Sequence, residues 1–167
     1  MNATNIDLGP CEVFIDGTSV GLTIGGVELT YAQEFHETTV DQYGKSVVER
    51  FLLGEKWTAK VPLAEFTLAN IQKAIPFGTL AGGKITIGAI AGKKASAHAA
   101  QLILHPTRLA TIDKTFDAVL YKAVQTNQIV IKNEPNGEKI LECLFEAMID
   151  TNRADGNMLG LFGDSTA

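Results

Sequence analysis

The sequence predicts a mainly β fold, an antiparallel β-sandwich or open barrel with one flanking α-helix and a long protruding β-hairpin. Apolar and polar residues alternate in several stretches, turn-forming residues separate these stretches, and one segment has the periodicity of a helix. The 167 residues are 46% hydrophobic and 20% charged, which is typical of one globular domain with a substantial core. We therefore expect a single domain over residues 1–167.

The longest expected hairpin joins residues 27–39 to residues 47–61. Apolar side chains occupy alternate positions of the first run, and the second run is rich in Val, Phe, Leu and Trp. Turn-forming residues from 41 to 46 separate the two. Both runs exceed the usual strand length of about 5–6 residues. We expect the hairpin to project from the body with its polar tip exposed.

The other elements follow from shorter signals. A helix is expected from Leu68 to Ile75, because Thr67 is a favourable N-cap residue and Pro76 stops the run. Further strands and turns are expected at 11–15, 16–17 (turn), 19–23, 84–90, 96–104, 116–124, 128–132, 134–137 (turn) and 139–150. Residues 1–8 read as an N-terminal arm and residues 151–167 as a loose C-terminal tail.

Composition and charge argue against several classes of function. The net charge of −5 and the pI of about 5.2 disfavour a surface that grips nucleic acid, since such surfaces are basic. We expect no membrane partner, because no window approaches the ~20 apolar residues of a membrane span, and no signal peptide in the polar residues 1–10. Cys11 and Cys143 are most simply reduced residues of the core.

The motifs that could carry chemistry all depart from their patterns. The run from Gly78 to Lys84 imitates a phosphate-binding loop, but a helix precedes it and Ile85 replaces the required hydroxyl residue. Residues 150–156 hint at a calcium loop with incorrect ligand spacing. The three histidines lack metal-like spacing, and the chain has no nucleophile elbow. We expect no enzymatic activity, no metal and no cofactor.

Two stretches of expected strands, residues 27–39 and 140–150, carry formal charges of one sign only. These charges are Glu28, Glu34 and Glu37 in the first, and Glu142, Glu146 and Asp150 in the second. One interpretation is a solvated sheet face. The other is an acidic wall past which a polyanion such as DNA slides without sticking. Few Lys or Pro protect these strands from edge pairing, so we expect pairing between subunits, which a closed ring completes.

Three stretches, at residues 9–17, 40–46 and 63–71, carry a resemblance to a known family. With them the chain resembles, over residues 9–150, the tail tube protein (major tail protein) of long-tailed bacteriophages. The resemblance implies a β-sandwich or open barrel flanked by a helix, a fold shared with contractile-tail tubes and with the Hcp tube protein of type VI secretion. It also implies rings, usually hexameric, that stack into a tube. Some phage tubes use trimers of duplicated domains, and this chain has no duplication, which favours six copies.

The resemblance implies a structural virion protein whose tube conducts DNA during ejection, without specific DNA binding. The lumen would be lined by acids, here Glu28, Glu34, Glu142 and Glu146. The hairpin tip would contact the adjacent ring, here through Asp41, Gln42, Tyr43, Gly44 and Lys45. The implied partners are other copies of the chain and the tail-tip, tape-measure and terminator proteins. The implied location is the virion tail, assembled in the host bacterial cytoplasm.

Two alternatives stay open. The first is another β-rich virion component, such as a tail terminator or a head–tail connector, which forms one ring and stops. The second is a binding module or a secreted tube protein of the type VI kind.

Overall fold

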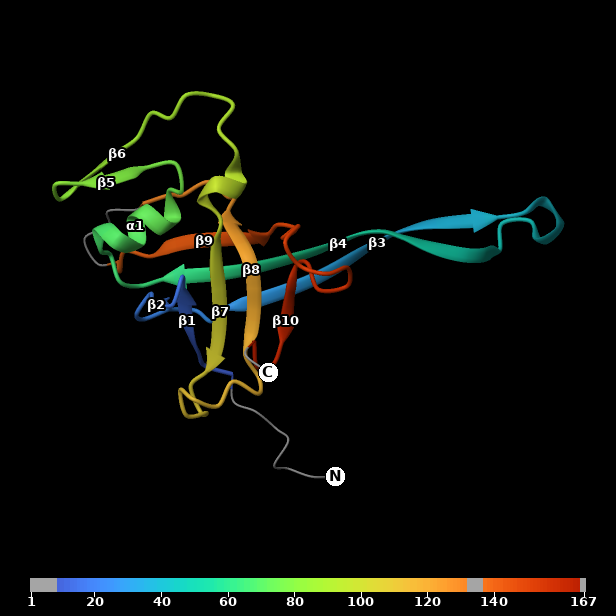
Figure 1. The fold of residues 1–167 in the computed structure, drawn as a ribbon, viewed down its shortest axis with the longest axis horizontal. Coiled ribbons are helices and arrows are strands. Elements are labelled where there is room, and N and C mark those ends of the chain that lie inside the picture. The colour runs from blue at the N-terminus through green and yellow to red at the C-terminus, as the bar shows by residue number, and fades with distance from the viewer. Residues whose placement is uncertain (1–8, 132–136, 166–167) are drawn as a thin grey trace.

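A computed structural model describes residues 9–131 and 137–165. These residues form a mainly β structure with antiparallel sheets and one α-helix, which confirms the expected fold class. Figure 1 shows the body of the molecule, from which the hairpin of β3 (Glu28–Thr39) and β4 (Val47–Leu63) extends far to one side.

The body is one curved antiparallel sheet. Its strands pair in the order β2-β1-β7-β8-β9-β4-β3, and β10 pairs with β8 beside the end of β9. The strand bounds are β1 Cys11–Ile15, β2 Thr18–Ser19, β3 Glu28–Thr39, β4 Val47–Leu63, β7 Ala100–Pro106, β8 Ala118–Gln125, β9 Leu141–Ala147 and β10 Gly160–Phe162. The segment after β2 returns to β4, where Thr23 bridges Leu63 and the Leu22 carbonyl accepts from the Ala64 N–H. This contact partly closes the sheet into an open barrel.

The core fills the inside of this curved sheet. On β4, odd-numbered residues from Trp57 to Leu63 point inward, and their register partners on β9 are Phe145, Cys143 and Leu141. Buried side chains of β1, β7 and β8 belong to the same cluster. The period of two thus divides each strand between a core face and an outer face.

Helix α1, Leu68–Ala74, flanks this core. The Thr67 Oγ1 accepts a hydrogen bond from the Asn70 backbone N–H at 3.2 Å, which confirms the predicted N-cap. Asn70 is buried, and its side-chain amide donates to the carbonyls of Val20 and Glu65, each at 2.9 Å. The helix is therefore held to the segment that closes the barrel.

Several predicted boundaries were wrong. The strand expected at 84–90 is only β6, Lys84–Thr86, which pairs with β5, Thr79–Ala81. The run 96–104 begins instead as a 3-10 helix, Ala95–His98, since its small residues have little strand preference. Residues 128–131 are not a strand. The remaining strands are mostly shorter than expected. The return strand expected at 19–23 is instead β2 at Thr18–Ser19, and the last long run is reduced to Leu141–Ala147.

The C-terminal segment also differs from the loose tail that the sequence predicted. Residues 160–162 form β10, and the segment before it contacts the body through the Asp150 N–H, which donates to the Met158 carbonyl at 2.9 Å. The expected N-terminal arm, 1–8, and most of the expected turn at 134–137 lie outside the described residues.

Candidate functional site

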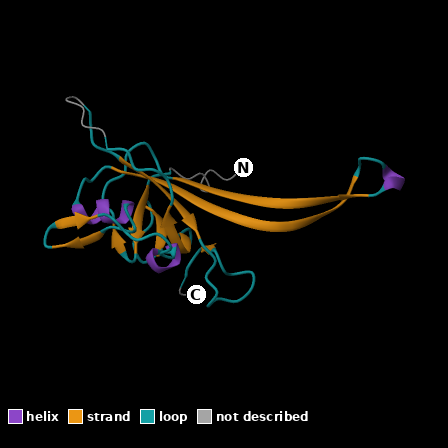
Figure 2. Cartoon of the chain, turned by 90° about the horizontal axis from the view of Figure 1, so that it is seen from above, coloured by secondary structure: helices purple, strands orange, loops and turns teal. Residues whose placement is uncertain are grey.

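The hairpin leaves the body at Trp57, which is the last buried residue of β4 toward the tip. Beyond it, residues 47–56 of β4 and 31–37 of β3 are exposed on both faces. We call residues 31–56 the hairpin arm. Figure 2 shows that the arm curves away from the rest of the chain along its whole length. Its strands are paired with each other, and the described part of the body does not cover them.

The arm exposes many large apolar side chains. Of the side chains that the structure describes, eight large apolar ones on the arm are at least 40% exposed: Tyr31, Phe35, Tyr43, Val47, Val48, Phe51, Leu52 and Leu53. Scattered exposed apolar residues are ordinary on monomeric proteins, but a concentration of them marks an interaction surface. The arm therefore has the composition of an interface.

The register of the arm distributes these apolar side chains over both faces. Phe35 pairs with Leu52, and the next pair, His36 with Phe51, lies on the opposite face. The register shifts between Glu34 and Phe35, so Leu53 is an extra residue on β4 at a β-bulge. A partner could therefore contact the arm from either side.

The tip lies at the far end of the arm, as the sequence predicted (Figures 1 and 2). A 3-10 helix, Asp41–Tyr43, forms it, and Gly44 follows with φ of 61°, a conformation that favours glycine. All five predicted contact residues, Asp41, Gln42, Tyr43, Gly44 and Lys45, are exposed. The Tyr43 side chain is 68% exposed. Lys45 follows it two residues later in the sequence.

The four predicted lumen acids share one face of the sheet. Glu28 pairs with Lys60 and Glu34 with Gly54, while Glu142 pairs with Pro62 and Glu146 with Thr58. The β4 partners are all even-numbered, so they point away from the core-facing odd positions. We call the surface formed by Glu28, Glu34, Glu142, Glu146 and the even positions of β4 from Gly54 to Pro62 the acidic face.

The acidic face also carries two cations that the sequence analysis missed. Lys56 and Lys60 lie on β4, between the two acidic strands, and their Nζ atoms are 3.1 Å from Glu146 and 4.0 Å from Glu142. The face is thus acidic but partly neutralised. That these two lysines lie beside the acids follows only from the strand order, because β4 lies between β3 and β9 in the sheet.

The other acids of the two strands have different surroundings. Glu37 lies on the opposite face, where its carboxylate is 2.9 Å from the Arg50 guanidinium. Asp150 follows β9 and accepts from the Lys122 ammonium at 2.7 Å, and this hydrogen bond holds the pKa of Asp150 below its usual value. Arg153 adds a further contact at 3.5 Å. The carboxylate that resembled a calcium ligand is therefore occupied by cationic side chains.

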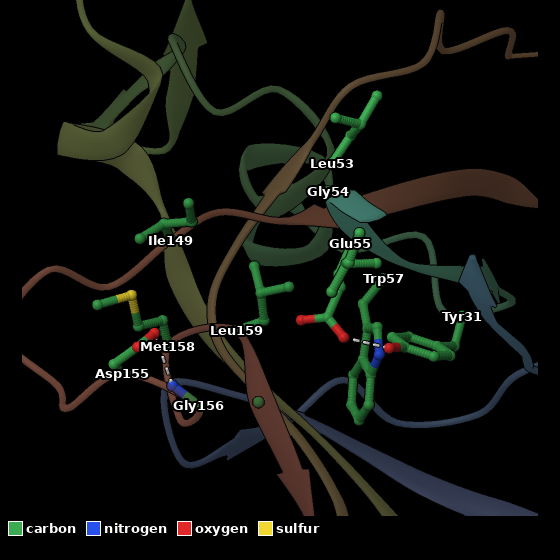
Figure 3. Close-up of a pocket in the computed structure, with 12 residues that line it drawn as sticks. Tyr31, Leu53, Gly54, Glu55, Trp57, Ile149, Asp155, Gly156, Met158 and Leu159 are labelled. Carbon is green, nitrogen blue, oxygen red and sulfur yellow. Dashed lines mark hydrogen bonds between the residues drawn. The ribbon is translucent and has the colours of Figure 1, made fainter. Parts of the chain in front are cut away.

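A groove lies at the base of the arm, where β3 and β4 meet the C-terminal segment (Figure 3). Its volume is about 390 Å³. The Trp57 ring lines the groove and packs edge-on against Tyr31, with ring centroids 5.8 Å apart. The Tyr31 hydroxyl donates to the Glu55 carboxylate, and this hydrogen bond raises the pKa of Tyr31. We call this hollow the basal groove.

The residues considered for chemistry are dispersed. Within 9–131 and 137–165, no three His, Cys, Asp or Glu side chains are grouped to hold a metal ion. Burial raises the pKa of the Cys143 thiol to about 12, so it stays protonated at neutral pH. Lys84 opens β6 rather than a helix, which differs from a phosphate-binding loop.

One buried ionisable pair escaped the sequence analysis. The His105 Nδ1 and Asp117 Oδ1 atoms are 2.6 Å apart, and both side chains are 6% exposed. The pair joins β7 to the residue that precedes β8. Such a contact has no local pattern in the sequence, because the β7–β8 register creates it.

No family model matches the chain, and no curated protein matches it. The part of the chain that the structure describes also contains no helix long and apolar enough to cross a membrane.

Proposed function

We propose that this protein is a structural subunit that assembles through its hairpin arm into stacked rings, and that the resulting tube conducts DNA. The observation that carries the proposal is the arm itself, a paired β-ribbon that leaves the body and exposes apolar side chains on both faces. The proposal agrees with the resemblance to phage tail tube proteins in residues 9–150.

The energetics of the arm support an assembled state. Complete burial of a Leu, Val or Phe side chain is worth about 1.5–3 kcal/mol relative to exposure. Eight large apolar side chains of the arm, six of them Leu, Val or Phe and two of them Tyr, are at least 40% exposed in the isolated chain. Two-stranded ribbons are marginally stable on their own in water. Contact with neighbouring copies would cover the apolar surface and support the ribbon.

The sheet edge provides a second means of association. In the order of the described sheet β3 is terminal, so the backbone groups along its outer edge face outward. A long edge strand of this kind recruits another chain, and a closed ring of subunits leaves no free edge. We propose that lateral contacts in the ring use this edge, and that stacking contacts use the tip.

The charge of the acidic face supports the proposal that DNA passes through the tube. Its four carboxylates outnumber the two ammonium groups of Lys56 and Lys60, so it repels phosphate on balance. A lumen lined by this face would let DNA pass without retaining it. The protein would accordingly act as a conduit in the virion tail, without catalysis.

Electron microscopy of the purified protein, over a range of concentrations and with tail-tip partners added as nuclei, tests the proposal. We expect hollow tubes, and native mass spectrometry of ring intermediates should give six copies instead of three. Single rings that never stack would favour a terminator or connector. A chain that stays monomeric throughout would overturn the proposal.

A further inference from the structure

The wall of the basal groove combines apolar side chains from two separate parts of the chain. Leu52 and Leu53 come from β4, while Ile149, Met158 and Leu159 come from the C-terminal segment. Leu53 is 63% exposed and Ile149 is 60% exposed, so the wall is open to a partner. The groove therefore offers a concave apolar site to a protruding side chain.

The groove is acidic as well as apolar. Two carboxylates line it, Glu55 and Asp155, and its lining contains no cation among the described residues. Figure 3 shows Leu159 between these two carboxylates, with the Trp57 and Tyr31 rings beside Glu55. A fitting occupant would carry a large apolar group with a cation beside it.

The tip of the hairpin arm has this chemistry. The Tyr43 ring is the only aromatic side chain of residues 40–46, and Lys45 provides an ammonium group two residues later. The groove of the same chain is out of reach, since the paired strand residues 47–51, at ~3.3 Å each, separate Leu52 of the groove from the tip. The tip that fits the groove must therefore belong to another copy.

We propose that the basal groove is the receptor for the hairpin tip of a second copy of this chain. The Tyr43 ring packs on the apolar wall, and the Lys45 ammonium group lies beside Asp155 and Glu55. Tip and groove are different surfaces, so each contact leaves one free tip and one free groove, and the series continues as an open row. This inference rests on the proposed function, because it specifies which surface receives the tip when rings stack.

A photo-crosslinking amino acid at position 43 tests the contact in the full chain. An aromatic benzophenone side chain replaces Tyr43, and the crosslinked peptides are mapped by mass spectrometry in assembled and unassembled fractions. We expect crosslinks to the peptides that contain residues 52–57 and 149–160, and only in the assembled fraction. Crosslinks to other surfaces in well-formed tubes would overturn the groove as receptor and leave the tube proposal standing.

A charge-reversal pair tests the same contact independently. K45E should raise the protein concentration needed for assembly by about tenfold or more, since like charges then face each other. Adding D155K should bring that concentration back to within about threefold of the original. K93E, which reverses an exposed lysine distant from the groove, is the matched control and should have little effect.

The outcomes of this experiment separate the two proposals. If K45E assembles like the unmodified chain, or if D155K gives no rescue although the double variant folds, the groove proposal is overturned. If the unmodified chain never assembles, the proposed function fails and the groove proposal fails with it. Thermal unfolding of each variant checks that the fold is intact.

Discussion

Gly160 shows how one residue fixes the C-terminal segment on the body. A Cβ atom at this position would lie 2.3 Å from the Val119 carbonyl oxygen and 3.2 Å from the Trp57 ring. The backbone oxygen cannot move without disturbing the β8–β10 pairing. The absence of a side chain at position 160 therefore allows β10 to approach both β8 and the Trp57 ring.

We expect Gly160→Ala to lower the free energy of unfolding by about 1–3 kcal/mol, the usual range for overpacking. Urea denaturation measures the change. Gly54→Ala is the matched control, because Gly54 also lies in a strand and its Cβ would meet no atom within 4 Å. Equal stability of the two variants would show that β10 adapts to the added methyl group.

The His105–Asp117 contact leads to a second prediction at this scale. Removal of one partner from a buried hydrogen-bonded pair leaves a buried polar group unsatisfied, which costs about 1–3 kcal/mol, whereas an exposed pair contributes about 0–1 kcal/mol. Asp117→Ala should therefore destabilise the chain far more than Glu37→Ala, which breaks the exposed pair with Arg50. Chemical denaturation of both variants gives the comparison, and similar losses would contradict the structural role of the buried pair.

At the scale of elements, the β3–β4 hairpin divides into two parts that differ in burial. The part from Trp57 to Leu63 belongs to the body, where one face enters the core and the other forms the acidic face. Residues 47–56 of the arm are all exposed, so they add nothing to the core. Changes in the arm should therefore affect association rather than folding.

Replacement of residues 41–46 by Asn-Gly tests this division. The dipeptide favours a two-residue hairpin turn, and β3 and β4 remain paired along the body. We expect thermal unfolding close to that of the original chain, rings that still form through strand edges, and no stacked tubes in negative-stain images. Tubes of normal length would show that the tip only connects the two strands.

At the scale of the whole molecule, the acidic face matters only if assembly turns it toward a lumen. Glu142→Lys should leave the fold nearly unchanged, since Glu142 is exposed and changes at such positions usually cost within about 0.5 kcal/mol. The new ammonium group would join Lys60 and attract phosphate, so DNA should leave the tube more slowly. Measurement of DNA ejection from virions tests this expectation.

The control for that experiment is Glu138→Lys, the same change at an exposed residue that precedes β9. It should leave ejection unaffected. Normal ejection with Glu142→Lys, in particles that assemble correctly, would mean that another surface lines the channel.

Local patterns in the sequence determined the mainly β class, the helix with its Thr67 cap and the projecting hairpin with its polar tip. These features depend on neighbours in the chain, through the period of two in strands and the short reach of a capping hydroxyl group. The strand at Cys11–Ile15 was predicted with its bounds for the same reason. The short strand β10 escaped prediction, because three residues are too few to show a period.

Only the tertiary structure decided which side chains share a surface. The placement of β4 between β3 and β9 brought Lys56 and Lys60 among the predicted acids, and the β7–β8 register created the His105–Asp117 pair. The basal groove likewise exists because β4 and the C-terminal segment meet. Strand order brings together residues that are far apart in the chain. The alternation of inward and outward side chains within a strand is the same whichever strand pairs with it, so this alternation does not reveal the neighbouring strand.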